Sequence, residues 1–151
     1  METIKTLSLT IDQDLVDQYN TYYFEQFPRR RKPPIERPIH ESINRWMIMG
    51  NISRNNLKQN WKNFVVWWVQ KLGLEFQIDE CSMKFKTFYP TRRRADCDNV
   101  VPKFILDGFV ESGLLIDDDY HHLQELSLSC SYDKNNPRTE ITVFIYKEHN
   151  K

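Results

Sequence analysis

A cluster of carboxylates in the second half of the chain is the set of residues best suited to chemistry. Three arginines stand directly before this cluster. Clustered carboxylates raise one another's pKa, so a fold that gathers them usually needs a divalent cation. Hard oxygen ligands suit Mg²⁺ or Mn²⁺, and neighbouring arginines suit a phosphodiester. The pattern predicts metal-assisted chemistry on nucleic acid. Between positions 96 and 119, the seven acidic residues are Asp96, Asp98, Asp107, Glu111, Asp117, Asp118 and Asp119.

The spacing of the first two aspartates favours a shared site. In an extended segment, Asp96 and Asp98 project to one side while Cys97 points to the other. Taken singly, Asp98 is explained as a helix N-cap and residues 117–119 as an acidic turn. Because one helix joins the two features and arginines flank them, together they indicate a metal site.

The connecting helix, expected over residues 99–112, carries a polar stripe of Asn99, Lys103 and Asp107. On the surface, the last two would form an ion pair worth less than about 0.5 kcal/mol. In a cleft, Lys103 would instead contact the scissile phosphate or stabilise the leaving oxyanion. Both alternatives are open at this point.

The order of these residues resembles the RusA family of Holliday-junction resolvases over roughly residues 83–145. The family pattern is an arginine-rich loop, Asp-x-Asp-Asn, a helix with a lysine and an Asp-Ala/Gly pair, then Asp-Asp. The resemblance implies a homodimeric, Mg²⁺-dependent endonuclease, with Mn²⁺ as a substitute, that resolves four-way DNA junctions by paired nicks in recombination and repair. Such resolvases often belong to phages or prophages. Carried over by position, the metal ligands are Asp96, Asp98 and Asp118 with Asp117 beside them, and Lys103 is the catalytic lysine.

The chain departs from the family pattern at three places. The interval from Asp98 to Asp107 is one residue longer than usual and contains Pro102. Ala95 stands where a basic residue is common. Residues 12–37 look like an insertion within a single RusA-like domain spanning residues 1–151.

Basic residues are segregated rather than in excess. The chain has 21 lysines and arginines against 21 acidic residues, whereas a strongly basic, non-specific DNA binder would show an excess of lysine and arginine; zero net charge alone excludes no function. Segment 28–38 holds four of the seven prolines and forms no regular element; it is either a solvated connector or a phosphate-contacting arm. The residues predicted to contact DNA are Arg30, Arg31, Lys84, Lys86, Arg92, Arg93 and Arg94.

Two other functions fit parts of the pattern. A junction-binding or DNA-binding protein of a phage or mobile element could have lost cleavage, although all three candidate acids are present. A transition-metal site could use Asp117, Asp119, His121 and His122. Adjacent histidines on a strand point to opposite faces, which disfavours this site.

Hydrophobic periodicity predicts an α/β (α+β) domain, with a small mixed, partly antiparallel sheet packed against helices. Segment 39–52 fits either a short helix or a strand and turn, and its resemblance to a RusA N-terminal loop favours the strand. Trp61 and Trp68 are expected in the core, whereas Trp67 and the aromatic residues 15–27 of the helix predicted over 12–27 are candidates for the dimer interface. The expected strands are 5–11, 81–86, 126–132 and 141–145, and the further helix is 55–72, with Ser53 as its N-cap and Gly73 after its end.

Three cysteines without metal-ligand spacing indicate free thiols in a reducing cytoplasm. We expect no secretory signal, because the N-terminal residues lack an apolar stretch. The longest apolar run, 64–69, is too short to span a bilayer, so no membrane partner is expected. Nothing in the sequence calls for an organic cofactor.

Overall fold

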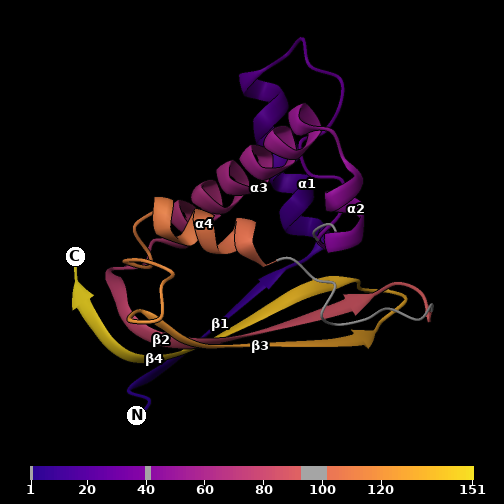
Figure 1. Ribbon diagram of the computed structural model, residues 1–151. Coiled ribbons are helices and arrows are strands. Elements are labelled where there is room, and N and C mark those ends of the chain that lie inside the picture. Colours follow the sequence, from indigo (N-terminus) through magenta and orange to yellow (C-terminus); the bar gives the residue numbers. More distant parts are fainter. Residues whose placement is uncertain (1, 40–41, 93–101) are drawn as a thin grey trace.

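The chain folds into one four-stranded sheet with its helices gathered on one face, in a computed structural model that describes residues 2–39, 42–92 and 102–151 (Figure 1). The predicted α+β class with a mixed sheet is confirmed. The strands are β1 (Lys5–Ile11), β2 (Phe76–Tyr89), β3 (Leu123–Tyr132) and β4 (Arg138–Asn150), and the helices are α1 (Gln13–Gln26), α2 (Ile43–Ile48), α3 (Asn51–Leu72) and α4 (Lys103–Glu111).

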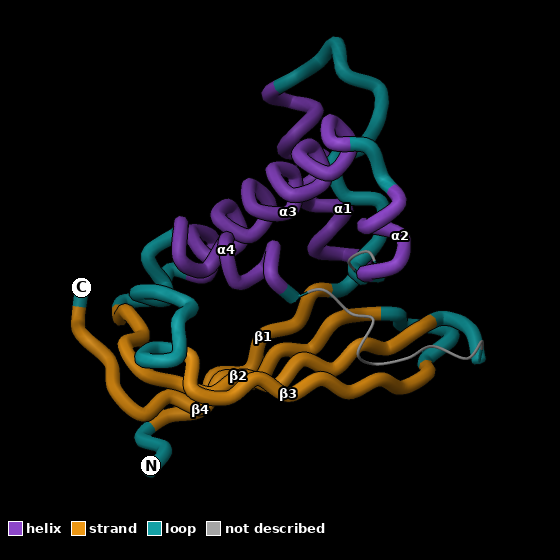
Figure 2. The backbone as a smooth tube through the Cα atoms, viewed as in Figure 1, coloured by secondary structure: helices purple, strands orange, loops and turns teal. Residues whose placement is uncertain are grey.

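The sheet has the order β1-β4-β2-β3. The β1–β4 and β4–β2 pairs are antiparallel, whereas β2 and β3 are parallel. Parallel neighbours need a crossover, and α4 supplies it on the helical side of the sheet, as Figure 2 shows. The chain leaving α4 therefore returns to the beginning of β2 before it enters β3.

The core lies between the helical face of the sheet and α3. Alternate strand residues such as Met83, Phe85 and Val143 are buried there, as their period-two spacing predicts. Trp61 and Trp68 are each 3% exposed, so their predicted place in the core is confirmed. None of the helices in the described segments is long and apolar enough to cross a membrane.

The aromatic helix α1 packs on α3 through rings. Asp12 caps it, since its carboxylate accepts a 2.9 Å hydrogen bond from the Leu15 amide. The ring centroids of Tyr19 and Tyr22 lie 5.2 and 6.0 Å from that of Trp67. Trp67, predicted as a candidate for the dimer interface, thus makes its ring contacts within the chain.

The strand favoured for residues 39–52 is wrong, because a short helix forms there. The Ser42 hydroxyl accepts a 3.2 Å hydrogen bond from the Arg45 amide and starts α2. Gly50 then caps α3, which begins at Asn51 rather than after the predicted cap, Ser53. Its end was predicted correctly: Gly73 takes the left-handed conformation, with φ of 62°.

Candidate active site

The acidic loop, residues 117–119, is held beside the first part of β2. The Ile78 amide donates to the Leu114 carbonyl at 2.7 Å, and the Ile116 amide donates back to the Ile78 carbonyl at 3.1 Å. After the acidic residues, the His122 carbonyl accepts from the Cys81 amide at 2.8 Å. Because both sides of the loop are bonded to β2, its carboxylates are displayed on a fixed backbone.

The loop presents its carboxylates to solvent. Asp117 is exposed and Asp118 is half-buried. One oxygen of Asp117 accepts a 2.7 Å hydrogen bond from the Asp118 amide, and Asp119 accepts a 3.0 Å bond from the His121 amide. Hard oxygens on a fixed loop fit a divalent cation, and Asp117 and Asp118 are the described members of the predicted set. Asp96 and Asp98 lie outside the described residues.

Lys103 begins α4, and its ammonium lies 3.5 Å from a carboxylate oxygen of Asp107. The two side chains are 65% and 21% exposed. The surface ion pair considered from the sequence is therefore formed, and the lysine still reaches solvent. Glu111 ends α4 about 12 Å from Lys103 at 1.5 Å per residue, so the helix separates this lysine from the acidic loop.

The described basic residues of the prediction lie at three separate places. Lys84 and Lys86 alternate with buried Met83 and Phe85 on β2, so they face away from the helices. The guanidinium of Arg92, beyond the other end of β2, lies 4.8 Å from the centre of the Tyr132 ring. Cys81 and Tyr89 are roughly 25 Å apart along the strand, so Arg92 is far from the acidic loop. Arg30 and Arg31 line a groove near α2, and Arg93 and Arg94 lie outside the described residues.

Residues 4–144 match a family model described as Endodeoxyribonuclease RusA. The chain belongs to the RusA endodeoxyribonuclease family. The match extends well beyond residues 83–145, on which the resemblance was first based, and takes in α1 to α3. No curated protein matches the chain significantly. The predicted metal ligands, Lys103 and the DNA-contacting residues stay predictions within this family assignment.

This RusA family member also contains an ionic cluster that the sequence analysis missed. Asp79 on β2 accepts hydrogen bonds from His149 at 2.7 Å and from His122 at 3.1 Å. The His122 ring nitrogen Nδ1 also lies 2.6 Å from the Asp79 carbonyl, and Lys147 is 3.5 Å from the carboxylate. The cluster ties the end of the acidic loop to β2 and β4. No local sequence motif predicts this cluster, because His122 and His149 are 43 and 70 residues away from Asp79 in the sequence.

The same contacts exclude the transition-metal site considered above. His122 is bonded to Asp79, while the His121 ring lies 4.1 Å from that of Tyr120. Within residues 2–39, 42–92 and 102–151, no three histidine, cysteine or acidic side chains are gathered in a way that could hold a metal ion. Asp117, Asp119, His121 and His122 therefore do not form a joint site.

The cluster shifts the pKa values of two of its members in opposite directions. The hydrogen bond to the Asp79 carbonyl raises the pKa of His122 above 6.5; desolvation opposes this, and the charge of Asp119 adds to it. Desolvation would raise the pKa of Asp79, but the hydrogen bond from His149 and the charge of Lys147 outweigh it and hold the value below 3.8. Folding therefore favours the charged form of both residues.

These shifts predict how stability depends on pH. The contribution of His122 is complete below pH 6.5 and is lost as the pH rises through its raised pKa. The contribution of Asp79 is present above pH 3.8 and is lost as the pH falls through its lowered pKa. We expect the free energy of unfolding to decrease between about pH 6 and pH 8, a range in which histidine charge changes.

Urea unfolding across this pH range would measure the effect, with His122→Asn expected to flatten the slope. His121→Asn is the matched control, because the His121 ring packs on Tyr120 instead of bonding to Asp79. A slope that His122→Asn leaves unchanged would contradict the assignment.

Proposed function

We propose that this RusA family member is a divalent-metal-dependent endonuclease, using Mg²⁺ or Mn²⁺, that resolves four-way DNA junctions by paired nicks in recombination and repair. The observation that carries the proposal is the fixed acidic loop, which presents Asp117 and Asp118 in a chain of the RusA family. The predicted partners Asp96 and Asp98 belong to the same matched range. Phages and prophages are the expected source, and the cytoplasm the expected compartment.

In the proposed site, Asp96, Asp98 and Asp118 hold the cation, and Asp117 stands beside them. Bound Mg²⁺ supplies Lewis-acid polarisation of the phosphoryl oxygen and a water of lowered pKa. The amide of Asp118 already donates to Asp117, which fixes that carboxylate relative to its neighbour.

Lys103, which stands at the opposite end of α4 from the acidic loop, is proposed to neutralise charge that develops on the phosphodiester in the transition state. Its exposed ammonium is oriented by Asp107 rather than buried against it. An ion pair of this exposure is worth about 1 kcal/mol or less, so a phosphate can compete for the lysine.

The basic residues are proposed to bind phosphates rather than bases, which gives affinity with little sequence preference. Lys84 and Lys86 would contact DNA on β2, Arg30 and Arg31 would do so near α2, and Arg92, Arg93 and Arg94 are the further proposed contacts. A homodimer with two-fold symmetry would place two sites on the junction, whose own symmetry is approximately two-fold. This arrangement accounts for paired nicks.

The test is cleavage of a labelled four-way junction compared with a linear duplex of the same sequence. We expect paired nicks in the junction alone with Mg²⁺ or Mn²⁺, and none with EDTA. For Asp98→Asn we expect a rate at least about 100-fold lower, because removing a direct metal ligand should reduce activity no less than removing an outer-shell partner of a ligand does. Tight junction binding without cutting in either metal would refute the nuclease and favour the non-cleaving DNA-binding protein.

A further inference from the structure

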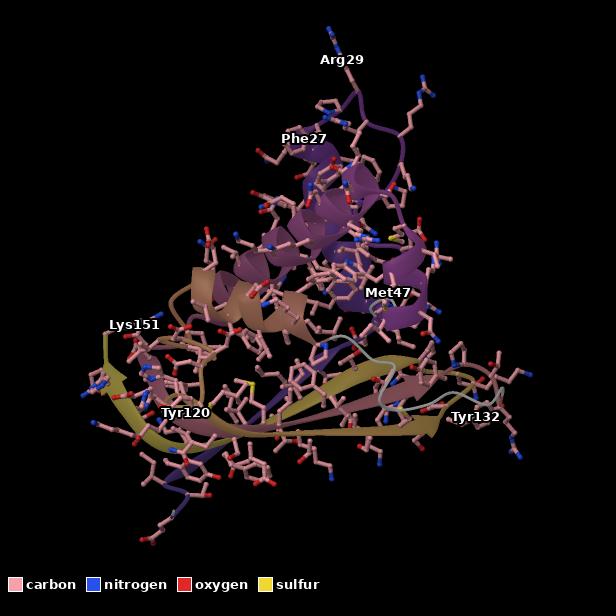
Figure 3. All side chains as sticks on the ribbon, in the orientation of Figure 1. Phe27, Arg29, Met47, Tyr120, Tyr132 and Lys151 are labelled. Atoms are coloured by element: carbon pink, nitrogen blue, oxygen red, sulfur yellow. The ribbon has the colours of Figure 1, made fainter. Side chains whose placement is uncertain are left out.

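A basic groove lies between segment 28–38, α2 and the first turns of α3, with a cavity volume of about 1000 Å³. Among the described residues that line it, six side chains are basic and Glu36 alone is a carboxylate, in a chain whose total charge is balanced. Figure 3 shows Arg29 at the tip of the helical layer, remote from Tyr120 beside the acidic loop and from Tyr132 at the end of β3. The basic residues are Arg29, Arg30, Arg31, Lys32, Arg37 and Arg45.

The segment that carries most of these cations is anchored to the rest of the fold. Ile35 is 1% exposed, and its carbonyl accepts a 2.8 Å hydrogen bond from the Asn20 side chain. The Pro38 carbonyl accepts a 2.8 Å bond from the buried hydroxyl of Thr139 on β4. Prolines restrict the backbone further. The backbone of the segment is therefore fixed at these two points, which lowers the ordering that binding a ligand requires.

The composition of the groove selects its ligand. Five cations of segment 28–38 suit a polyanion, since Glu36 is the one carboxylate among the described lining residues; the ion pair Lys32–Glu36 spans 3.9 Å between exposed groups and is weak. Trp61 lines the floor but is only 3% exposed, so a base cannot stack on it. The groove can thus contact a phosphate backbone, and Tyr23, which also lines it and is half-buried, offers a single partly exposed ring to a base.

We propose that this groove binds the phosphate backbone of a DNA arm, without regard to base sequence, at a distance from the acidic loop. The choice of DNA as the polyanion rests on the proposed function. The groove, its charge and its anchoring are features of the structure and are independent of that function. Such a site would add affinity and orient an arm of the junction while leaving cleavage chemistry to the acidic residues.

The experiment measures affinity by fluorescence anisotropy in EDTA, for a four-way junction and for a linear duplex, over a range of salt concentrations. We expect Arg30→Gln/Arg31→Gln to weaken binding to both DNAs by at least about tenfold near 0.1 M salt and to lower the salt slope by roughly 2, since each lost phosphate contact removes about 0.9. Lys58→Gln/Lys71→Gln removes the same charge from α3 outside the groove and is expected to retain both affinity and slope.

A third variant tests the anchoring without altering charge. Thr139→Val removes the bond to Pro38 and should weaken binding less than the double arginine variant, while circular dichroism confirms that the fold is intact. Equal losses for the groove and control variants, or unchanged affinity of the groove variant, would overturn the proposal; the latter would favour another polyanion such as an acidic protein. Wild-type protein that binds both DNAs through the groove yet cuts neither with Mg²⁺ would refute the proposed nuclease and leave the groove proposal standing.

Discussion

Replacing Asp118 with asparagine is expected to lower the rate of junction cleavage by about 100-fold or more, because losing a direct metal ligand should cost no less than the roughly 10–100-fold lost with an outer-shell partner. The substitution preserves the size of the side chain and removes its charge, so the backbone bonds that hold the loop to β2 should persist. Junction binding in EDTA should be at least as tight as for the wild type, because a negative charge near DNA has been removed. Single-turnover cleavage together with anisotropy would separate the two effects.

Asp119→Asn is the matched control for this experiment. It removes the same charge from the adjacent residue, while the new amide oxygen can still accept the hydrogen bond from His121. If the acidic loop acts only through its total charge, both variants should lose the same activity. We expect the Asp119→Asn variant to keep most of the cleavage activity. If it lost as much activity as Asp118→Asn, the assignment of Asp118 as a metal ligand would be contradicted.

Helices and strands could be predicted from the sequence wherever the spacing of hydrophobic residues reflects which side chains are buried. The period-two pattern of Met83 and Phe85 and the helical stripe through Trp61 and Trp68 both follow from side chains that the core buries. The start of α3 could not be predicted in this way, because Gly50-Asn51 reads equally as a turn and as a helix N-terminus. A mixed sheet was predicted, but the sequence did not show that β2 and β3 are the parallel neighbours, since strand order depends on long-range packing.

In the candidate site, too, features that depend on local sequence could be predicted and features that depend on tertiary structure could not. Spacing along the chain identified Asp117, Asp118 and Lys103 as chemically suitable, because residue types and intervals are local properties. It could not show that Lys103 begins α4 while the acidic loop follows its other end. Nor could it find Asp79 and its two histidines, which meet only when β2, β4 and the acidic loop are brought together.

The close approach of α4 to α3 leads to the second large effect, on stability. A Cβ atom added at Gly108 would lie 2.5 Å from the Cβ of Val65 and 2.6 Å from its Cγ1. A change of rotamer cannot move a Cβ, so Gly108→Ala must push the helices apart. Overpacking should outweigh the helix propensity gained, and we expect a net loss of about 2–3 kcal/mol, seen by urea unfolding. The family pattern allows alanine after this aspartate, so Val65 is what makes glycine necessary here.

Substitutions at Val65 distinguish this steric account from a simple loss of backbone freedom. Val65→Ala removes the Cγ contacts but keeps the Cβ, so Gly108→Ala should still be destabilising in that background, though less so. Val65→Gly removes the Cβ as well, and there Gly108→Ala should be neutral or stabilising by up to about 1 kcal/mol, the propensity difference between alanine and glycine. A cost of Gly108→Ala that is the same in all three backgrounds would contradict the proposed clash. Because α4 connects Lys103 to the acidic loop, Gly108→Ala should also lower the rate of junction cleavage in the wild-type background. In the Val65→Gly background, Gly108→Ala should cause no such fall in rate, as expected if small displacements of catalytic groups are costly.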